Sequence, residues 1–163
     1  MLQKKVCLLG AYAVGKTSLV ARFVHSVFSA TYHTTVGVKI SKKIINVNDQ
    51  KMKILLWDLA GDDEVTSIRS SYLHGASGYL FVVDGTRPNT LGTVVSLSKR
   101  VRSEIGDTPS VVLLNKVDLT PGWALHEDAM REIKKLGKQI FCTSALTGEN
   151  VQAAFSSLAQ FMM

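Results

Sequence analysis

The residues with the clearest chemistry form the segment Gly10–Thr17, which reads G-A-Y-A-V-G-K-T and fits the pattern G-x-x-x-x-G-K-[ST]. It stands between an apolar, strand-like run, Val6–Leu9, and a segment with helical spacing. A turn in that setting presents successive backbone N–H groups and a helix N-terminus to phosphate oxygens. Lys16 would reach the β- and γ-phosphates, and the Thr17 hydroxyl would bind Mg²⁺. The segment therefore predicts a nucleotide-binding loop.

A second polar segment, Asn115–Asp118 (N-K-V-D), bears on the choice of base. It follows the apolar run Ser110–Leu114, so it falls at the carboxyl end of a strand, where ligands of open α/β sheets bind. The Asp118 carboxylate can accept two hydrogen bonds, from N1–H and the exocyclic amine of guanine, a pair that adenine lacks. Lys116 would lie along the base, and Asn115 would brace the loop. The segment predicts guanine selectivity.

A third segment, Trp57–Gly61 (W-D-L-A-G), follows another strand-like run. Asp58 at such a strand end can hold Mg²⁺ through a water molecule. The Gly61 backbone N–H can donate to a γ-phosphate oxygen, which would make the following residues sensitive to the presence of that phosphate.

Apolar spacing predicts the elements that position these segments. Buried strands are expected at 6–9, 78–83 and 110–114, and a short strand at 139–142. Two strand-like stretches at 36–47 and 51–57 are joined by the turn Asn48-Asp49-Gln50 as a hairpin. Helical faces run from Leu19 to Val27, Leu91 to Ile105, Ala129 to Leu136 (ending at Gly137) and Val151 to Phe161. The order predicts one α/β domain, residues 1–163, with a six-stranded, mostly parallel sheet, one antiparallel edge strand and helices on both faces.

Composition restricts the partners. A length of 163 residues favours one domain. We interpret the lysines and arginines behind the net charge of +6 as solvated faces, with a patch for an acidic membrane or protein as the alternative. No recognised nucleic-acid module accompanies the charge, so nucleic acid is not an expected partner.

Targeting signals and cysteines indicate the compartment. The sequence shows no secretory leader, no apolar run near the roughly 20 residues that span a bilayer, and no cysteine near Met163. Leu2 stands where a myristoylation signal would need glycine. We expect a cytoplasmic protein that meets a membrane only indirectly. Cys7 and Cys142 lie in apolar stretches outside any C-x-x-C pair, and both are predicted to be buried thiols in a reducing compartment.

The three polar segments, in this order and spacing, closely resemble those of the Ras-like small GTPases, and of the Rab branch in particular. The resemblance covers essentially the whole chain. It implies a P-loop small G domain that binds GTP or GDP with Mg²⁺ and changes two switch segments between the two nucleotide states. Effectors, exchange factors and GTPase-activating proteins would bind those segments, near residues 30–45 and 60–75, with Trp57 and Tyr72 part of the surface.

The resemblance also assigns further residues. Thr35 matches the switch threonine that contacts Mg²⁺ and the γ-phosphate, Phe28 the aromatic residue beside guanine, and Tyr32 a residue that covers the phosphates. The Ala145 N–H would contact the base oxygen. The implied nucleotide-binding residues are Gly10, Ala13, Val14, Gly15, Lys16, Thr17, Ser18, Phe28, Tyr32, Thr35, Gly61, Asn115, Lys116, Asp118, Ser144, Ala145 and Leu146; the metal ligands are Thr17, Thr35 and Asp58; the catalytic residues are Lys16, Thr35, Gly61 and Asp62.

Two departures from the family bear on catalysis. Asp62 stands where the family usually has glutamine, and a carboxylate can only accept hydrogen bonds while its charge faces developing negative charge. Tyr12 and Ala13 stand where many Ras proteins have glycine. We therefore predict slow intrinsic hydrolysis, which an activator that donates both an arginine and a glutamine would tolerate. The alternatives are a non-hydrolysing, GTP-bound scaffold and a P-loop kinase or ATPase; the second and third polar segments argue against the latter.

Overall fold

The computed structural model describes residues 1–29, 37–59 and 68–163. It contains a six-stranded sheet in the order β2-β3-β1-β4-β5-β6, in which β2 is antiparallel to β3 and the other neighbouring strands are parallel. This confirms the predicted mostly parallel sheet with an antiparallel edge strand. The strands are β1 (Leu2–Gly10), β2 (Val38–Val47), β3 (Gln50–Leu59), β4 (Gly78–Asp84), β5 (Ser110–Asn115) and β6 (Gln139–Thr143).

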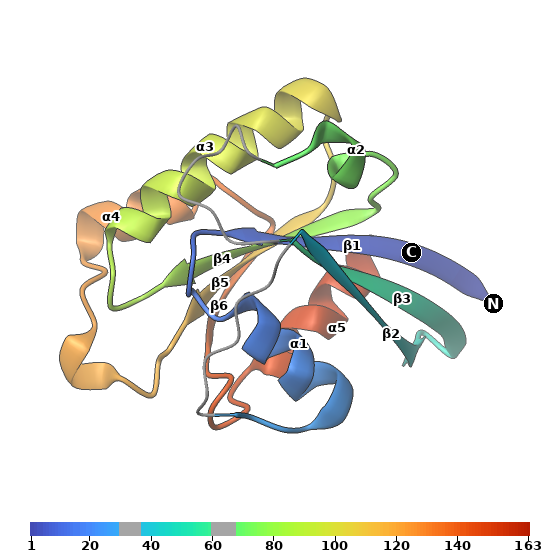
Figure 1. Cartoon of the computed structure of the whole chain (residues 1–163), viewed down its shortest axis with the longest axis horizontal. Helices are drawn as coiled ribbons and strands as arrows, with labels where there is room; N and C mark the ends of the chain where they lie inside the picture. Colours follow the sequence, from blue (N-terminus) through green and yellow to red (C-terminus); the bar gives the residue numbers. More distant parts are fainter. Residues whose placement is uncertain (30–36, 60–67) are drawn as a thin grey trace.

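Helices cover both faces of the sheet, as predicted. Figure 1 shows α1 and α5 on one face, and α2, α3 and α4 on the other. Each face has its own apolar core, and β4, which contributes to both cores, is buried along its whole length. The helices are α1 (Lys16–His25), α2 (Ser70–Leu73), α3 (Asn89–Glu104), α4 (Glu127–Ile133) and α5 (Val151–Phe161), with a short 3-10 helix, η2, at Thr120–Gly122.

The predicted hairpin joins β2 to β3 through Asn48 and Asp49, and Gln50 already belongs to β3. Both turn residues have positive φ angles, 50° and 65°. Two-residue hairpin turns of this handedness favour Asn and Asp because their side chains tolerate the left-handed region. Because the turn fixes the register, Val38 lies opposite Leu59. The first residues of β2 are therefore paired with the last residues of β3, which belong to the third polar segment.

Three local predictions were wrong. Helix α1 ends at His25 because Ser26 takes a left-handed conformation and donates its N–H to Arg22 O, so Val27 lies outside the helix and is 53% exposed. Helix α4 ends at Ile133, and Leu136 packs against the core from a turn. Cys142 is exposed because β6 is the outermost strand of the sheet, whereas Cys7 in β1 is buried as predicted.

The stacked rings of Phe23 and Phe155 join α1 to α5, with centroids 4.1 Å apart and planes 8° from parallel. Phe23 is 2% exposed, so Phe23→Ala should lower the free energy of unfolding by about 3–5 kcal/mol. Val24→Ala, at the neighbouring half-buried position, should cost about 1 kcal/mol or less. Urea unfolding followed by circular dichroism measures both, and equal losses would contradict the packing.

Candidate nucleotide-binding site

The loop between β1 and α1 requires glycine at its two ends. A Cβ on Gly10 would lie 2.5 Å from the carbonyl oxygen of Val82 in β4, so the loop leaves the sheet only if this residue has no side chain. Gly15 has a φ of 104° as the N-cap of α1, and a Cβ there would overlap the side-chain amide of Asn115. The two glycines of the sequence pattern thus let the loop pass close to its neighbours.

Lys16 begins α1 and folds back under this loop. Its side chain is buried, and Nζ donates to the carbonyl oxygens of Gly10 and Ala11, each at 3.2 Å. Burial lowers the pKa of Lys16 from its ordinary value to about 8, while the nearby Asp58 carboxylate acts in the opposite direction. A cation with so little water around it is stabilised when an anion binds beside it, so Lys16 is suited to contact a phosphate.

Thr17 and Asp58 bring two oxygen donors together beside the loop. Thr17 Oγ1 donates to Asp58 Oδ2 at 2.5 Å, and Asp58, in β3, is 1% exposed. Magnesium prefers oxygen ligands and takes only one or two from the protein, completing its shell with water and phosphate oxygens. The pair therefore fits a Mg²⁺ ion that arrives with a nucleotide.

Asn115, at the end of β5, ties three segments together. Its Nδ2 donates to Val14 O at 2.9 Å, and its Oδ1 accepts from Thr143 Oγ1 at 3.1 Å. Its backbone oxygen accepts from the N–H of Gly85, just beyond β4. Asn115 is 2% exposed and both side-chain partners are buried, so Val14 O and Thr143 Oγ1 would have neither a partner nor water if the side-chain amide were removed. This is the bracing role that the sequence predicted for Asn115.

Asp118 lies next to the loop that follows β6. Ser144 Oγ donates to Asp118 Oδ1 at 2.7 Å and accepts from the N–H of Thr147 at 3.0 Å. Asp118 is half-buried, and a carboxylate can accept about four hydrogen bonds, so it retains capacity for a base. The structure therefore brings Asp118 and Ser144, which were predicted from separate segments, to the same end of the sheet.

Arg22 supports that loop and was missed in the sequence. Its Nε donates to Ala145 O at 2.9 Å and its Nη2 to Leu146 O at 2.6 Å. It comes from the last turn of α1, so the helix that starts at the first loop also fixes the residues implied to contact the base. A lone arginine on a helix gives no signal of this contact in the sequence.

Asp84 was also missed, although an acidic residue directly after the apolar run 78–83 is a recognisable signal for a strand-end site. Lys116 Nζ lies 2.9 Å from Asp84 Oδ2 and 3.0 Å from Ala13 O, so Lys116 links β4 to the phosphate-binding loop. Burial of Asp84 would raise its pKa, but hydrogen bonds from Thr86, Lys116 and Arg87 prevail and hold the pKa below its usual value. The carboxylate therefore remains charged at neutral pH.

Of the other site residues that the sequence predicted, some are described by the structure and some are not. Ser18 lies in the first turn of α1, and Phe28, beyond the helix, is 39% exposed. Ala145 is buried and Leu146 is 48% exposed. Tyr32, Thr35, Gly61 and Asp62 lie outside the described residues.

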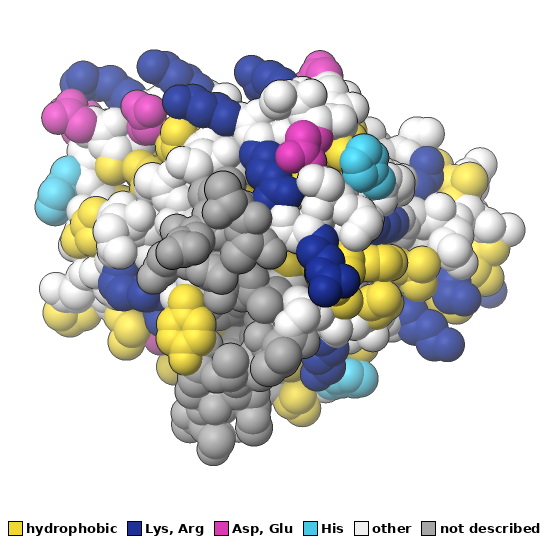
Figure 2. Space-filling model, turned by 45° about the horizontal axis from the view of Figure 1, so that its top comes forward, with side chains coloured by type: hydrophobic (Ala, Val, Ile, Leu, Met, Phe, Trp, Pro, Cys, Tyr) yellow, Lys and Arg dark blue, Asp and Glu magenta, His cyan; other side chains and the backbone are white. Residues whose placement is uncertain are grey.

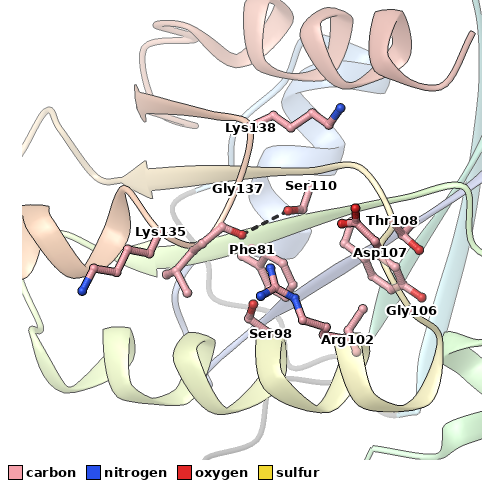
Figure 3. A pocket seen from close by; sticks show the side chains of 13 residues that line it. Phe81, Ser98, Arg102, Gly106, Asp107, Thr108, Ser110, Lys135, Gly137 and Lys138 are labelled. Atoms are coloured by element: carbon pink, nitrogen blue, oxygen red, sulfur yellow. Dashed lines mark hydrogen bonds between the residues drawn. The ribbon is translucent and has the colours of Figure 1, made fainter.

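A separate hollow of about 190 Å³ lies at the opposite ends of the central strands, where β5 begins at Ser110. Figure 3 shows the Arg102 side chain directed into it beside Phe81, and Lys138 directed away. The hollow is smaller than the roughly 300 Å³ at which ordinary small-molecule pockets begin. It shares no residue with the nucleotide-binding loop, so it is not the site described above.

Comparison with known proteins identifies the family. The sequence model that describes the Ras family matches residues 5–163 of this chain. This chain belongs to the Ras family. It is 36% identical over 156 residues to Ras-related protein RABA1c of Arabidopsis thaliana, covering 94% of this chain and 72% of the relative. It is 31% identical to Ras-related protein SEC4 of Saccharomyces cerevisiae (97% and 74% covered) and 32% identical to Ras-related protein Rab-13 of Canis lupus familiaris (96% and 78% covered).

These relatives place the chain close to the Rab branch of the Ras family, as the sequence predicted. Members of the family are GTP-binding switches and GTPases, and they generally bind the nucleotide with Mg²⁺. Among residues 1–29, 37–59 and 68–163, no helix is both long enough and apolar enough to cross a bilayer.

Asn115→Ala should weaken nucleotide binding because it leaves Val14 O and Thr143 Oγ1 without their partner. We expect dissociation of a fluorescent GDP analogue to accelerate by about 30-fold or more, from about 1–3 kcal/mol for each of the two groups left unsatisfied. Asn46→Ala, on the exposed part of β2, is the matched control and should leave the rate unchanged. Equal rates for the two variants in stopped-flow chase experiments would refute the bracing role.

Proposed function

We propose that this chain binds GTP and GDP with Mg²⁺ as a molecular switch, with guanine selected by Asp118. The observation that carries the proposal is the hydrogen bond from Asn115 to Val14 O, which joins the phosphate-binding loop to the loop that bears Asp118. A nucleotide spans a phosphate group and a base, so a site for it must fix both loops relative to each other. Two loops that start from rigid strand ends and are hydrogen-bonded to each other meet that requirement.

Switching would use the segments that contain Thr35 and Gly61. Both adjoin one end of the β2–β3 ladder, since Val38 pairs with Leu59. Asp58, one residue before that end, is hydrogen-bonded to Thr17. A γ-phosphate and Mg²⁺ at Thr17 would therefore lie beside the start of both segments, and contacts from Thr35 and Gly61 would order them only in the GTP state.

Effectors would read the exposed face of β2 and β3 together with α2. Trp57 packs against Tyr72 with ring centroids 6.3 Å apart, and Ile40, which pairs with Trp57 across the strands, is 52% exposed. Lys5 Nζ lies 3.8 Å from the Trp57 ring centroid. Figure 2 shows hydrophobic side chains gathered beside the grey segments and bordered by Lys and Arg. Such an apolar patch with a charged rim is typical of an interaction surface.

Intrinsic hydrolysis would be slow because Asp62 replaces the amide that orients the attacking water. The same residue supports a second candidate function, a GTP-bound scaffold that does not hydrolyse. Tyr12, 44% exposed on the phosphate-binding loop, adds bulk where an arginine from an activator would approach. In both cases effectors would act through the two switch segments; only the switch requires exchange factors and an activating protein.

Asp118→Asn should shift base preference from guanine toward xanthine. The amide still accepts from Ser144 Oγ but offers an N–H to the oxygen that replaces the exocyclic amine of guanine. Competition of GDP and XDP for the loaded protein measures the preference. Asp107→Asn, an exposed aspartate in the loop between α3 and β5, is the matched control and should retain guanine selectivity. Unchanged selectivity in Asp118→Asn would refute the assignment.

Asp62→Gln should accelerate single-turnover GTP hydrolysis by roughly tenfold or more, because the amide can donate to the phosphoryl oxygens where the carboxylate cannot. Phosphate release from preloaded protein measures the rate, with Asp107→Gln as control. Release from the wild type at the rate of ordinary glutamine-bearing relatives would contradict slow hydrolysis. A variant that remains inactive while it binds GTP normally would favour the scaffold.

A further inference from the structure

The backbone carbonyl oxygens of residues 10–14 all accept hydrogen bonds from side chains. The donors are Lys16 Nζ to Gly10 and Ala11 (3.2 Å each), Arg87 Nη2 to Tyr12 (2.6 Å), Lys116 Nζ to Ala13 (3.0 Å) and Asn115 Nδ2 to Val14 (2.9 Å). Three of these donors belong to the polar segments recognised in the sequence. Arg87 does not, and it comes from the turn between β4 and α3.

Holding these carbonyls sets the direction of the N–H groups. In a trans peptide the C=O and the following N–H point in opposite directions, so fixing Tyr12 O toward Arg87 turns the N–H of Ala13 the other way. The same holds for the next two peptides. Among the described residues, none accepts a hydrogen bond from the N–H groups of Ala13, Val14 or Gly15. The three donors therefore remain available for phosphate oxygens.

The loop conformation needs such support. Ala13 has a φ of 62°, in the left-handed region that residues with a Cβ adopt at a cost of about 1 kcal/mol or more. Without a restraint on the carbonyls to either side, the Tyr12–Ala13 peptide could rotate to a relaxed conformation and withdraw an N–H group. Lys116 restrains the carbonyl after Ala13, and Arg87 restrains the one before it.

Arg87 is itself fixed. Its Nε lies 3.0 Å from Asp84 Oδ2, on a carboxylate that is 1% exposed and also contacts Lys116. Its backbone N–H donates to Asp84 O, and its backbone oxygen accepts from the Thr90 N–H at the start of α3. One buried carboxylate thus orients two cations toward consecutive carbonyls of the loop. The Arg87 guanidinium reaches Asp84 and Tyr12 O at the same time because it presents its donors in a rigid fork, with one branch for each partner.

We propose that Arg87, held by Asp84, is a positioning residue that keeps the phosphate-binding loop in its binding conformation and so slows release of the bound nucleotide. The inference rests on the proposed guanine-nucleotide function and deepens it. Arg87 touches neither nucleotide nor metal in this role. It acts through the Tyr12 carbonyl and therefore through the Ala13 N–H group.

Two substitutions separate this role from a simple effect of charge. Arg87→Met removes both branches of the fork. Arg87→Lys keeps the positive charge, but its ammonium ends one bond short of Nη2, the atom that reaches Tyr12 O while Nε stays on Asp84. If Arg87 only attracted phosphate through its charge, the lysine variant would behave as the wild type. If it restrains the loop, the lysine variant should resemble the methionine variant.

Arg131→Met is the matched control. Arg131 also pairs with carboxylates three and four residues earlier in the chain, Asp128 at 3.2 Å and Glu127 at 3.4 Å. Arg131 and both of these partners belong to α4, so the pairs do not involve the phosphate-binding loop. A change common to the two methionine variants would reflect the general loss of a surface arginine.

The experiment measures dissociation of a fluorescent GDP analogue from the full chain with Mg²⁺, chased with excess GDP. We expect Arg87→Met to accelerate release by roughly tenfold, the size of one charge-assisted hydrogen bond discounted for partial exposure, and Arg131→Met to change it by less than about twofold. On a logarithmic scale, Arg87→Lys should accelerate release by more than half as much as Arg87→Met does. Release from Arg87→Met within about twofold of the control, or a wild-type rate in Arg87→Lys, would overturn the proposal.

A spectroscopic measurement tests the mechanism independently of stability. Because the loop N–H groups would donate to the phosphates of a bound nucleotide, the ³¹P resonance of the β-phosphate of bound GDP should shift in Arg87→Met and stay in place in Arg131→Met. The imino proton of the bound guanine should not move in either. An unshifted β-phosphate would refute action through the loop. A wild type that binds no guanine nucleotide would refute the proposed function itself, a result distinct from the failure of Arg87 alone.

Discussion

The hydrogen bond between the Asn115 amide and the Val14 carbonyl is the contact on which the rest of the site depends. It joins two loops whose bonded residues are 101 positions apart in the chain, and it lies where water cannot substitute for it. Gly15 must lack a Cβ because this amide occupies the space. The phosphate-binding loop, the start of α1 and the residues around Asp118 therefore form one unit, and a ligand that spans phosphate and base meets both parts already placed.

The sheet explains why these loops meet at all. Each strand that carries a polar segment ends at the same edge, because β1, β3 and β5 run in the same direction. Strands β1, β4 and β5 are apolar on both faces, so their ends are fixed by two cores rather than by loop contacts. A rigid sheet whose central strands end in polar residues at the carboxyl edge lets one end of the molecule specialise in binding while the other elements supply stability.

The sequence was sufficient for the fold because the fold follows from short-range patterns, and patterns of the same kind predicted the site residues. Apolar runs give the strands, Asn48 and Asp49 give the hairpin, and the glycine pattern gives the first loop. The errors arose where a local pattern competes with a cap or an edge: a left-handed Ser26 ends α1 before Val27, and the outer position of β6 leaves Cys142 exposed. Arg22 and Arg87 reach backbone oxygens in distant parts of the chain, which no spacing rule encodes, whereas Asp84 carried a strand-end signal that was overlooked.

Isothermal titration calorimetry of the full chain with GDP and with ADP, both with Mg²⁺, tests the central claim most directly. A preformed phosphate site joined to a guanine-selective loop predicts one GDP bound per chain and an affinity for ADP lower by at least about a thousandfold, because adenine cannot offer the Asp118 carboxylate its two donors. Equal affinities for GDP and ADP, or no binding of GDP, would contradict it.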